Sequence, residues 1–270
     1  MLTIRSLFKK KNDRQDPFQI THLEETDSTN TYIRQVASKQ QQGDQPQDTP
    51  SARYQVVTAA YQSAGRGQGS NSWESERGKN LLFSILCHPA WIPITGQFIL
   101  SEAIALAIRD ALACYDSHFT IKWPNDIYWN DKKICGILIE NTLGGGHIKD
   151  CILGVGLNVN QNAFHSDAPN PVSLYQILGH EVDCKALLQD ILKRFDANIQ
   201  ATLNGSYAAI IGNYTSWLYR LHGFYPYRDG NGEFEAAIVE VEDDGHLVLR
   251  DREDRIRRYA FKEVEFIIKA

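Results

Sequence analysis

The chain has 270 residues, of which 43% are hydrophobic and 23% charged, so it can bury one large core, or one large and one small. Its net charge of −5 at pH 7 argues against bulk affinity for nucleic acid or an anionic membrane surface. The sequence has no run approaching the roughly 20 apolar residues that a membrane-spanning helix needs. The N-terminus lacks the apolar core and small-residue cleavage site of a signal peptide. We therefore expect a cytoplasmic protein that does not associate with membranes.

Cysteine and histidine spacing argues against disulfide and zinc chemistry. The five cysteines are widely spaced and form no Cys-x-x-Cys pair, which argues against a disulfide framework or a structural zinc site. The eight histidines contain no His-x-x-x-His pattern, so a catalytic zinc site is not indicated either. We expect a reduced protein without a dedicated metal site.

The first fifty residues predict a tail, a strand and a helix. Residues 1–19 carry several basic side chains and favour a solvated tail. Residues 18–23 alternate loosely and predict a strand, after which Asp27, Ser28 or Thr29 can cap a helix. The two hydroxyls could serve for capping only, or could also face a polar ligand group. The polar residues 38–53 predict a loop.

The most informative stretch is a glycine-rich segment between two predicted strands, 56–60 and 81–86. It contains Gly65, Arg66 and Gly67, followed by Trp73. Glycines allow a backbone to approach a ligand closely, and consecutive N–H groups can form a nest for an anion. An arginine there would match a carboxylate or phosphate. The segment is therefore either a loop that closes over an anionic small molecule or a flexible hairpin with an incidental arginine.

The middle of the chain predicts a buried helix and a sheet with glycines on its strands. Apolar residues recur at helical spacing over 97–114. The strand-like run 119–129 contains Pro124, which predicts a bend or a sheet edge there. The strands at 133–140 and 151–158 carry glycines in otherwise apolar runs, and these glycines could form a floor for a flat ligand.

The last hundred residues predict scaffold helices and a separate small domain. Three helices are expected at 173–179, 185–203 and 207–221. About five short strands separated by turns follow Gly223, which suits a small barrel. We place a domain boundary near residue 222.

Four motifs together resemble the biotin protein ligase family. They are DSTN at 27–30, YQSAGRGQGSNSW at 61–73, KWPNDIYWNDKKICGILIE at 122–140 and GVGLN at 154–158. Their order and spacing also match the family, and the resemblance covers about residues 20–270. It implies an α+β fold, with a mixed β-sheet, helices packed on one side and a C-terminal SH3-like β-barrel.

The resemblance implies three regions and a two-step reaction. The regions are an N-terminal tail (1–19), a catalytic biotin- and ATP-binding domain (20–221) and an SH3-like domain (222–270). Biotin and Mg-ATP would give biotinoyl-5′-AMP and pyrophosphate, and a lysine of a biotin carboxyl carrier protein would then take the biotin. The Mg²⁺ ion would be held largely by phosphates and waters.

The resemblance also implies roles for individual residues. The implied binding residues for biotin and ATP are Ser28, Thr29, Gln62, Gly65, Arg66, Gly67, Trp73, Asn125, Asp126, Lys133, Gly136 and Gly154. Arg66 and Lys133 would neutralise the carboxylate and α-phosphate, and Asp126 would orient the ligand and act as the base for the incoming amine. Trp73 would cover the adenylate, while Lys122 matches the motif without a separate implied role.

The sequence departs from the family pattern in two places. Gln68 stands where many members have a second arginine, so the glycine-rich segment carries less positive charge. The N-terminus lacks the helix-turn-helix domain of the biotin-sensing repressors, so we expect the monofunctional type, without specific DNA binding. The alternatives are a lipoate-protein ligase-like acyltransferase and a non-catalytic biotin sensor. The oligomeric state stays open, with a homodimer among the options.

Overall fold

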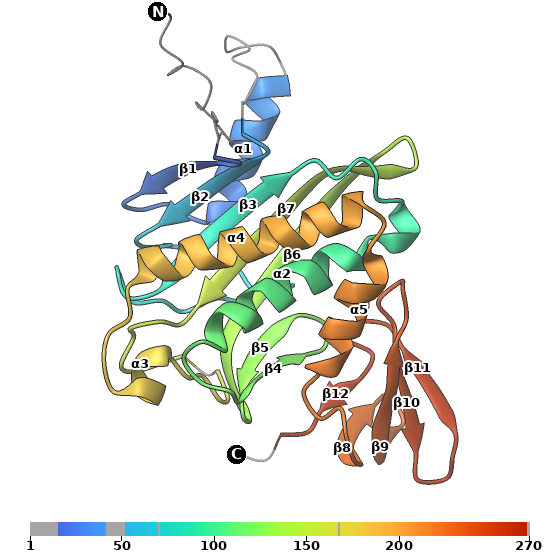
Figure 1. Ribbon diagram of the computed structural model, residues 1–270. Helices are drawn as coiled ribbons and strands as arrows, with labels where there is room; N and C mark the ends of the chain where they lie inside the picture. Colours follow the sequence, from blue (N-terminus) through green and yellow to red (C-terminus); the bar gives the residue numbers. More distant parts are fainter. Residues whose placement is uncertain (1–15, 42–51, 70, 167, 269–270) are drawn as a thin grey trace, which may run out of the picture.

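The computed structural model describes residues 16–41, 52–69, 71–166 and 168–268 (Figure 1). Most of the predicted tail and most of the predicted polar loop lie outside these residues. Within the described part of the chain, no helix combines the length and apolar character needed to cross a bilayer.

A seven-stranded mixed sheet forms the centre of the molecule, in the order β1-β2-β3-β7-β6-β5-β4. Its strands are β1 (Phe18–Leu23), β2 (Tyr54–Ala59), β3 (Leu81–Cys87), β4 (Phe119–Lys122), β5 (Asp126–Trp129), β6 (Lys132–Gly144) and β7 (His147–Leu157). Only the β1–β2 pair is parallel, while the other neighbours in this sheet are antiparallel. Every residue of β3 is buried, because this apolar strand is covered on both faces.

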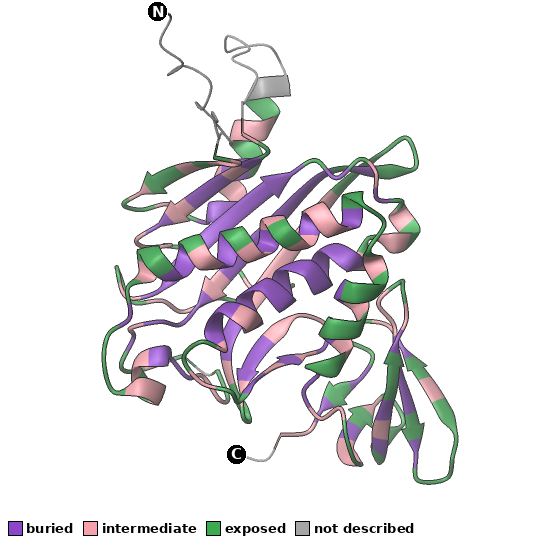
Figure 2. Ribbon diagram, viewed as in Figure 1, coloured by how far each residue is buried: buried purple, intermediate pink, exposed green. Residues whose placement is uncertain are grey.

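The long helices lie together on one face of this sheet (Figure 1). They are α2 (Phe98–Leu112), α4 (Cys184–Leu203) and α5 (Tyr207–Ser216). Two shorter segments precede them in the chain: a 3₁₀ turn at Ile94–Gly96 before α2, and the short helix α3 (Leu174–Leu178) before α4. Figure 2 shows α2 buried around most of its surface, whereas α4 buries one stripe and exposes the other. This agrees with the largely apolar sequence of α2, which buries even Glu102 and Arg109, and with the amphipathic sequence of α4.

Helix α1 (Thr29–Gln41) packs on the opposite face of the sheet. Its Ile33 forms a separate small core with Val57, Leu86 and Ile152. These strand residues alternate with those that face α2, such as Phe83 and Ile85 on β3. The prediction of a mixed sheet with helices on one side is thus confirmed for the long helices, and α1 is the exception. Helix α1 and the sheet thus form a corner. The strands that carry the glycines, β6 and β7, face this corner.

The predicted bend at Pro124 is a hairpin between β4 and β5, at the end of the sheet order. Lys122 pairs with Asp126 across this turn, and the Trp123–Pro124 peptide bond is cis. The predicted helix 207–221 ends earlier, at Ser216. It ends there because the next residues pair with β4: the Ile121 N–H donates to the Trp217 carbonyl at 2.8 Å.

The C-terminal region forms a second, antiparallel sheet of five strands in the order β11-β10-β9-β8-β12. The strands are β8 (Tyr225–Asp229), β9 (Gly232–Val241), β10 (Leu247–Asp251), β11 (Ile256–Tyr259) and β12 (Glu265–Phe266). This confirms the five predicted short strands and is consistent with an SH3-like domain. The Trp123 indole N–H donates to the Gly245 carbonyl at 2.9 Å, which ties this sheet to the β4–β5 turn. The exact domain boundaries stay a prediction.

Candidate functional site

A large cavity of about 1290 Å³ lies on the face of the sheet that carries α1. Its walls come from the start of α1, the glycine-rich segment, the strands β4 to β7 and the C-terminal residues 261–268. The sequence-predicted residues that line it are Ser28, Thr29, Gln62, Arg66, Gly67, Trp73, Asn125, Asp126, Lys133, Gly136 and Gly154. Gly65 is the one predicted residue that does not line the cavity; a Cβ there would lie 2.7 Å from the Trp73 carbonyl oxygen.

The start of α1 forms a polar corner of the cavity. The Ser28 carbonyl accepts the Tyr32 N–H at 3.0 Å and so closes the first helical turn. The Thr29 N–H and hydroxyl both donate to Gln62 Oε1, at 2.8 and 3.0 Å. Gln62 thus satisfies a backbone donor that a helix start leaves unpaired. Ser28, Thr29 and Gln62 thus stabilise the start of α1, and all three also line the cavity.

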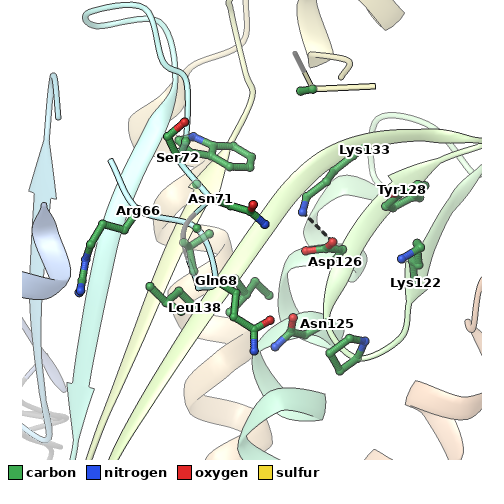
Figure 3. A pocket seen from close by; sticks show the side chains of 18 of the residues that line it. Arg66, Gln68, Asn71, Ser72, Lys122, Asn125, Asp126, Tyr128, Lys133 and Leu138 are labelled. Atoms are coloured by element: carbon green, nitrogen blue, oxygen red, sulfur yellow. Dashed lines mark hydrogen bonds and ion pairs between the residues drawn. The ribbon is translucent and has the colours of Figure 1, made fainter. Parts of the chain in front are cut away.

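A cluster around Glu140 fixes the direction of Arg66. Glu140 Oε1 accepts from Arg66 at 3.3 Å, and Glu140 Oε2 accepts from Arg34 at 2.6 Å and Asn30 at 2.8 Å. Burial by itself would raise the Glu140 pKa, but the hydrogen bonds and charges of these partners hold it below its ordinary value. Arg66 therefore points away from Lys133 and Asp126 (Figure 3). The two predicted cations line one cavity but lie apart.

The glycine-rich segment is folded back as a narrow hairpin. The Gly67 N–H donates to the Asn71 carbonyl at 2.7 Å, and the Trp73 N–H donates to the Gly65 carbonyl at 2.9 Å. The Trp73 indole lies on the predicted glycine floor, because a Cβ at Gly156 would be 2.4 Å from its Cε2. Its buried Nε1 has no hydrogen-bond partner among the residues that the structure describes. The glycines of the floor are therefore needed for a flat ring to lie there.

Lys133 and Asp126 form an ion pair on neighbouring strands. Lys133 Nζ lies 2.6 Å from Asp126 Oδ2, and the side chains are 32% and 24% exposed (Figure 3). Lys133 Nζ is also 6.0 Å from the centre of the Trp73 ring. A partly solvated pair of this kind contributes little to folding stability. It can therefore open at small cost and leave both groups available to a ligand.

Lys122 lies deeper, at the junction with the C-terminal sheet. Its ammonium is 4.6 Å from the ring centre of Phe266 and 5.7 Å from that of Tyr128. Burial lowers the pKa of Lys122, and the charge of Asp126 opposes this effect. Aromatic faces partly replace the water that a buried ammonium loses. The charge of Lys122 thus acts on Asp126 from the buried end of the cavity.

Several lining residues were not predicted from the sequence. Asn30 lies inside the DSTN motif, so the motif itself could have indicated it. The C-terminal wall had no such signal: it consists of Phe261, Lys262, Val264, Glu265, Phe266 and Ile268. These residues reach the cavity through the docking of two separate sheets, which no local pattern encodes.

Within the described ranges, side chains that could hold a metal ion are grouped at the β9–β10 turn: Glu242, Asp244 and His246. Arg258 already pairs with Glu242 and with Asp244, the latter at 2.7 Å. This group does not line the cavity. The carboxylate of Asp126, in the cavity, is engaged by Lys133, so the described residues offer no ready-made cage for a cation.

Comparison with known proteins gives the family. The model of the biotin/lipoate A/B protein ligase family matches residues 23–158. The biotin–[acetyl-CoA-carboxylase] ligase of Paracoccus denitrificans is 33% identical over 238 residues, which cover 84% of this chain and 92% of that protein. The chain belongs to the biotin/lipoate A/B protein ligase family.

Other members of the biotin/lipoate A/B protein ligase family are similar over different lengths. The bifunctional ligase/repressor BirA of Bacillus subtilis is 31% identical over 207 residues, or 73% of this chain. The chain spans about 62% of the length of this relative and of its Bacillus spizizenii counterpart. The Aquifex aeolicus biotin protein ligase, solved in complex with biotin and ATP, superposes with a TM-score of 0.73 at 24% identity. That match covers 93% of this chain and 99% of the Aquifex chain, and it shows the same fold.

Proposed function

We propose that this chain is a biotin protein ligase that joins biotin to AMP and then transfers biotin to a lysine of a biotin carboxyl carrier protein. The observation that carries the proposal is the single cavity that gathers eleven of the twelve residues assigned from the family motifs. The name of the Paracoccus denitrificans relative, a biotin–[acetyl-CoA-carboxylase] ligase matched over 92% of its length, supports the same substrate.

In the proposed first step, a carboxylate oxygen of biotin attacks the α-phosphorus of ATP. The bond between the α- and β-phosphates breaks, and pyrophosphate leaves with the electron pair. The substrate ATP brings Mg²⁺, which neutralises phosphate charge. The chain would contribute Lys133 and Arg66 as cations and a site sheltered by Trp73. For this, Arg66 must leave Glu140, which lies 3.3 Å away, and turn toward the ligand.

In the proposed second step, the amine of the carrier lysine attacks the acyl carbon of biotinoyl-AMP. An amide forms, AMP leaves, and the amine loses a proton. Asp126 is the proposed acceptor of that proton. It is held by Lys133 at 2.6 Å before ligands bind, and a turn of Lys133 toward phosphate would free the carboxylate for this task. One ion pair thus links the two steps.

The test is transfer to a defined acceptor. The protein is incubated with biotin, Mg-ATP and a purified biotin carrier domain, and mass spectrometry locates the product. We expect one biotin on the acceptor lysine and none on a carrier in which that lysine is replaced by arginine. Absence of transfer while biotinoyl-AMP accumulates would contradict the second half of the proposal.

A lipoate-protein ligase is the second candidate, because the family includes both activities. The five-stranded C-terminal sheet and the KWPND motif favour biotin, as the sequence resemblance implies. Replacing biotin with lipoate, and the biotin carrier with a lipoyl domain, in the same assay distinguishes the two.

A further inference from the structure

The tip of the glycine-rich segment lacks an available positive charge of its own. Arg66 is the only charged residue between Ala64 and Trp73, because Gln68 is neutral. The Arg66 guanidinium is turned toward Glu140, and Figure 3 shows Gln68 directed toward Asn125 instead. A triphosphate carries several negative charges, and this segment offers one cation, Arg66. To bind a triphosphate, the segment needs positive charge from another part of the chain.

Lys262 brings such a charge from the C-terminal sheet. A Cβ at Gly69 would lie 2.9 Å from Lys262 Nζ, so the ammonium rests directly against the tip of the segment. Gly69 has a φ of +68°, which glycine tolerates best. Lys262 and Gln68 both line the cavity. Residues 69 and 262 are distant in the sequence, and only the docking of the two sheets brings them together.

The turn that carries Lys262 presents the ammonium without a partner. The Glu263 N–H donates to the Ala260 carbonyl at 3.1 Å, and the Glu263 carboxylate accepts the Ala260 N–H at 2.7 Å. The neighbouring Glu265 pairs with Arg228 at 3.1 Å. Neither acid therefore takes up Lys262, which is exposed and makes no ion pair or hydrogen bond through its ammonium within the described ranges.

The backbone at Lys262 points the same way. Its φ is +74°, in the left-handed region that favours glycine and disfavours a long side chain. Packing does not explain a lysine here, since the side chain is exposed. A glycine would fit the turn better, so a lysine here carries a conformational cost.

We propose that Lys262 binds the triphosphate of ATP and supplies the positive charge that Gln68 does not. This assignment rests on the proposed function. Arg66 and Lys133 are the proposed partners of the carboxylate and α-phosphate, and Lys262 lies at the exposed tip of the segment, so it would contact the β- and γ-phosphates. These leave together as pyrophosphate, and an ammonium stabilises the charge that they gain. Lys262 makes and breaks no covalent bond.

The test compares Lys262→Gly with the wild-type protein, because glycine suits the left-handed turn and keeps the fold. We measure the KM for ATP and for biotin in pyrophosphate exchange, and the Kd of α,β-methylene-ATP by calorimetry. An exposed ionic contact of about 1 kcal/mol corresponds to roughly a fivefold change in affinity. We therefore expect the KM and Kd for the nucleotide to rise about fivefold, while the KM for biotin stays within twofold of wild type.

A second substitution tests the link to Gln68. Adding Gln68→Arg to Lys262→Gly should return the nucleotide constants to within about twofold of wild type, and adding Gln68→Ala should not. Lys193→Ala is the matched control, since Lys193 is an exposed lysine on α4, across the sheet from the cavity. Unchanged nucleotide constants in Lys262→Gly, or failure of arginine to restore them, would overturn the assignment. A wild-type protein that binds α,β-methylene-ATP but shows no biotin-dependent exchange would instead refute the proposed function, while the Kd comparison would still decide whether Lys262 binds the triphosphate.

Discussion

Gly154→Ala should damage both stability and biotin binding, because the added methyl group collides with a buried hydrogen-bonded side chain. An ideal Cβ at Gly154 would lie 2.1 Å from Asn30 Oδ1 and 2.7 Å from its Cγ. Asn30 is 3% exposed, and it accepts from the Ser84 hydroxyl at 2.6 Å and donates to Glu140 at 2.8 Å. To relieve the contact, Asn30 must move and break these bonds.

The size of the effect follows from the bonds at risk. A neutral hydrogen bond is worth about 0.5–1.5 kcal/mol and one to a charged group about 1.5–3 kcal/mol, so we expect a loss of about 2–4.5 kcal/mol in the free energy of unfolding. Movement of Asn30 also disturbs the polar corner at the start of α1, so the KM for biotin should rise at least about tenfold. Urea unfolding measures the first quantity and pyrophosphate exchange the second.

Gly144→Ala is the control on the neighbouring strand. A Cβ there would lie 3.7 Å from the nearest atom, Lys149 Cβ, which is an ordinary contact. We expect its free energy of unfolding within about 0.5 kcal/mol of wild type. If Gly154→Ala were as stable as Gly144→Ala and bound biotin normally, the close contact with Asn30 would not require glycine at position 154.

Three further predictions concern charged groups. Arg66→Ala should lose most adenylation, and Arg66→Lys should restore little, since a lysine ammonium does not reproduce the planar guanidinium. Near wild-type pyrophosphate exchange in a folded Arg66→Ala protein would remove Arg66 from the site. Lys133→Ala should lower kcat for exchange at least about a hundredfold by removing a cation beside the reacting phosphate, and stopped-flow adenylate formation checks this. Burial, with a smaller contribution from Asp243, raises the pKa of Glu102 to about 8. The unfolded carboxyl ionises near 4.5, so the contribution of Glu102 to stability falls as pH rises between these values. Glu102→Gln should therefore be more stable than wild type at pH 9, by up to about 5 kcal/mol at ~1.4 kcal/mol per pH unit, with the gain vanishing near pH 5 in urea titrations. An equal gain at both pH values would contradict the burial argument.

The sequence predicted the elements well where one pattern decides the structure. The largely apolar strand at 81–86 and the largely apolar helix at 97–114 both appear, because burial on two sides leaves little choice of conformation. Pro124 correctly indicated a turn at the end of the sheet. The helix predicted to reach Leu221 stops at Ser216, since pairing with β4 outweighs local helical preference.

The sequence predicted residues that line one cavity, but not how they are arranged in it. Motif spacing assigned Lys133 and Asp126, which meet because they lie on adjacent strands. It gave no indication that Arg66 pairs with Glu140, 74 residues away, or that the C-terminal sheet supplies a wall of the cavity. Long-range pairing of charges and docking of sheets depend on the whole fold, so a local pattern does not contain them.

The most direct test of the central claim is ATP–pyrophosphate exchange with the wild-type protein, run in parallel with biotin, with lipoate and without an acid. We expect exchange that requires biotin and Mg²⁺, is lost in Lys133→Ala, and is at least about a hundredfold weaker with lipoate. Exchange driven equally well by lipoate, or no exchange with biotin by a folded protein that binds ATP, would contradict it.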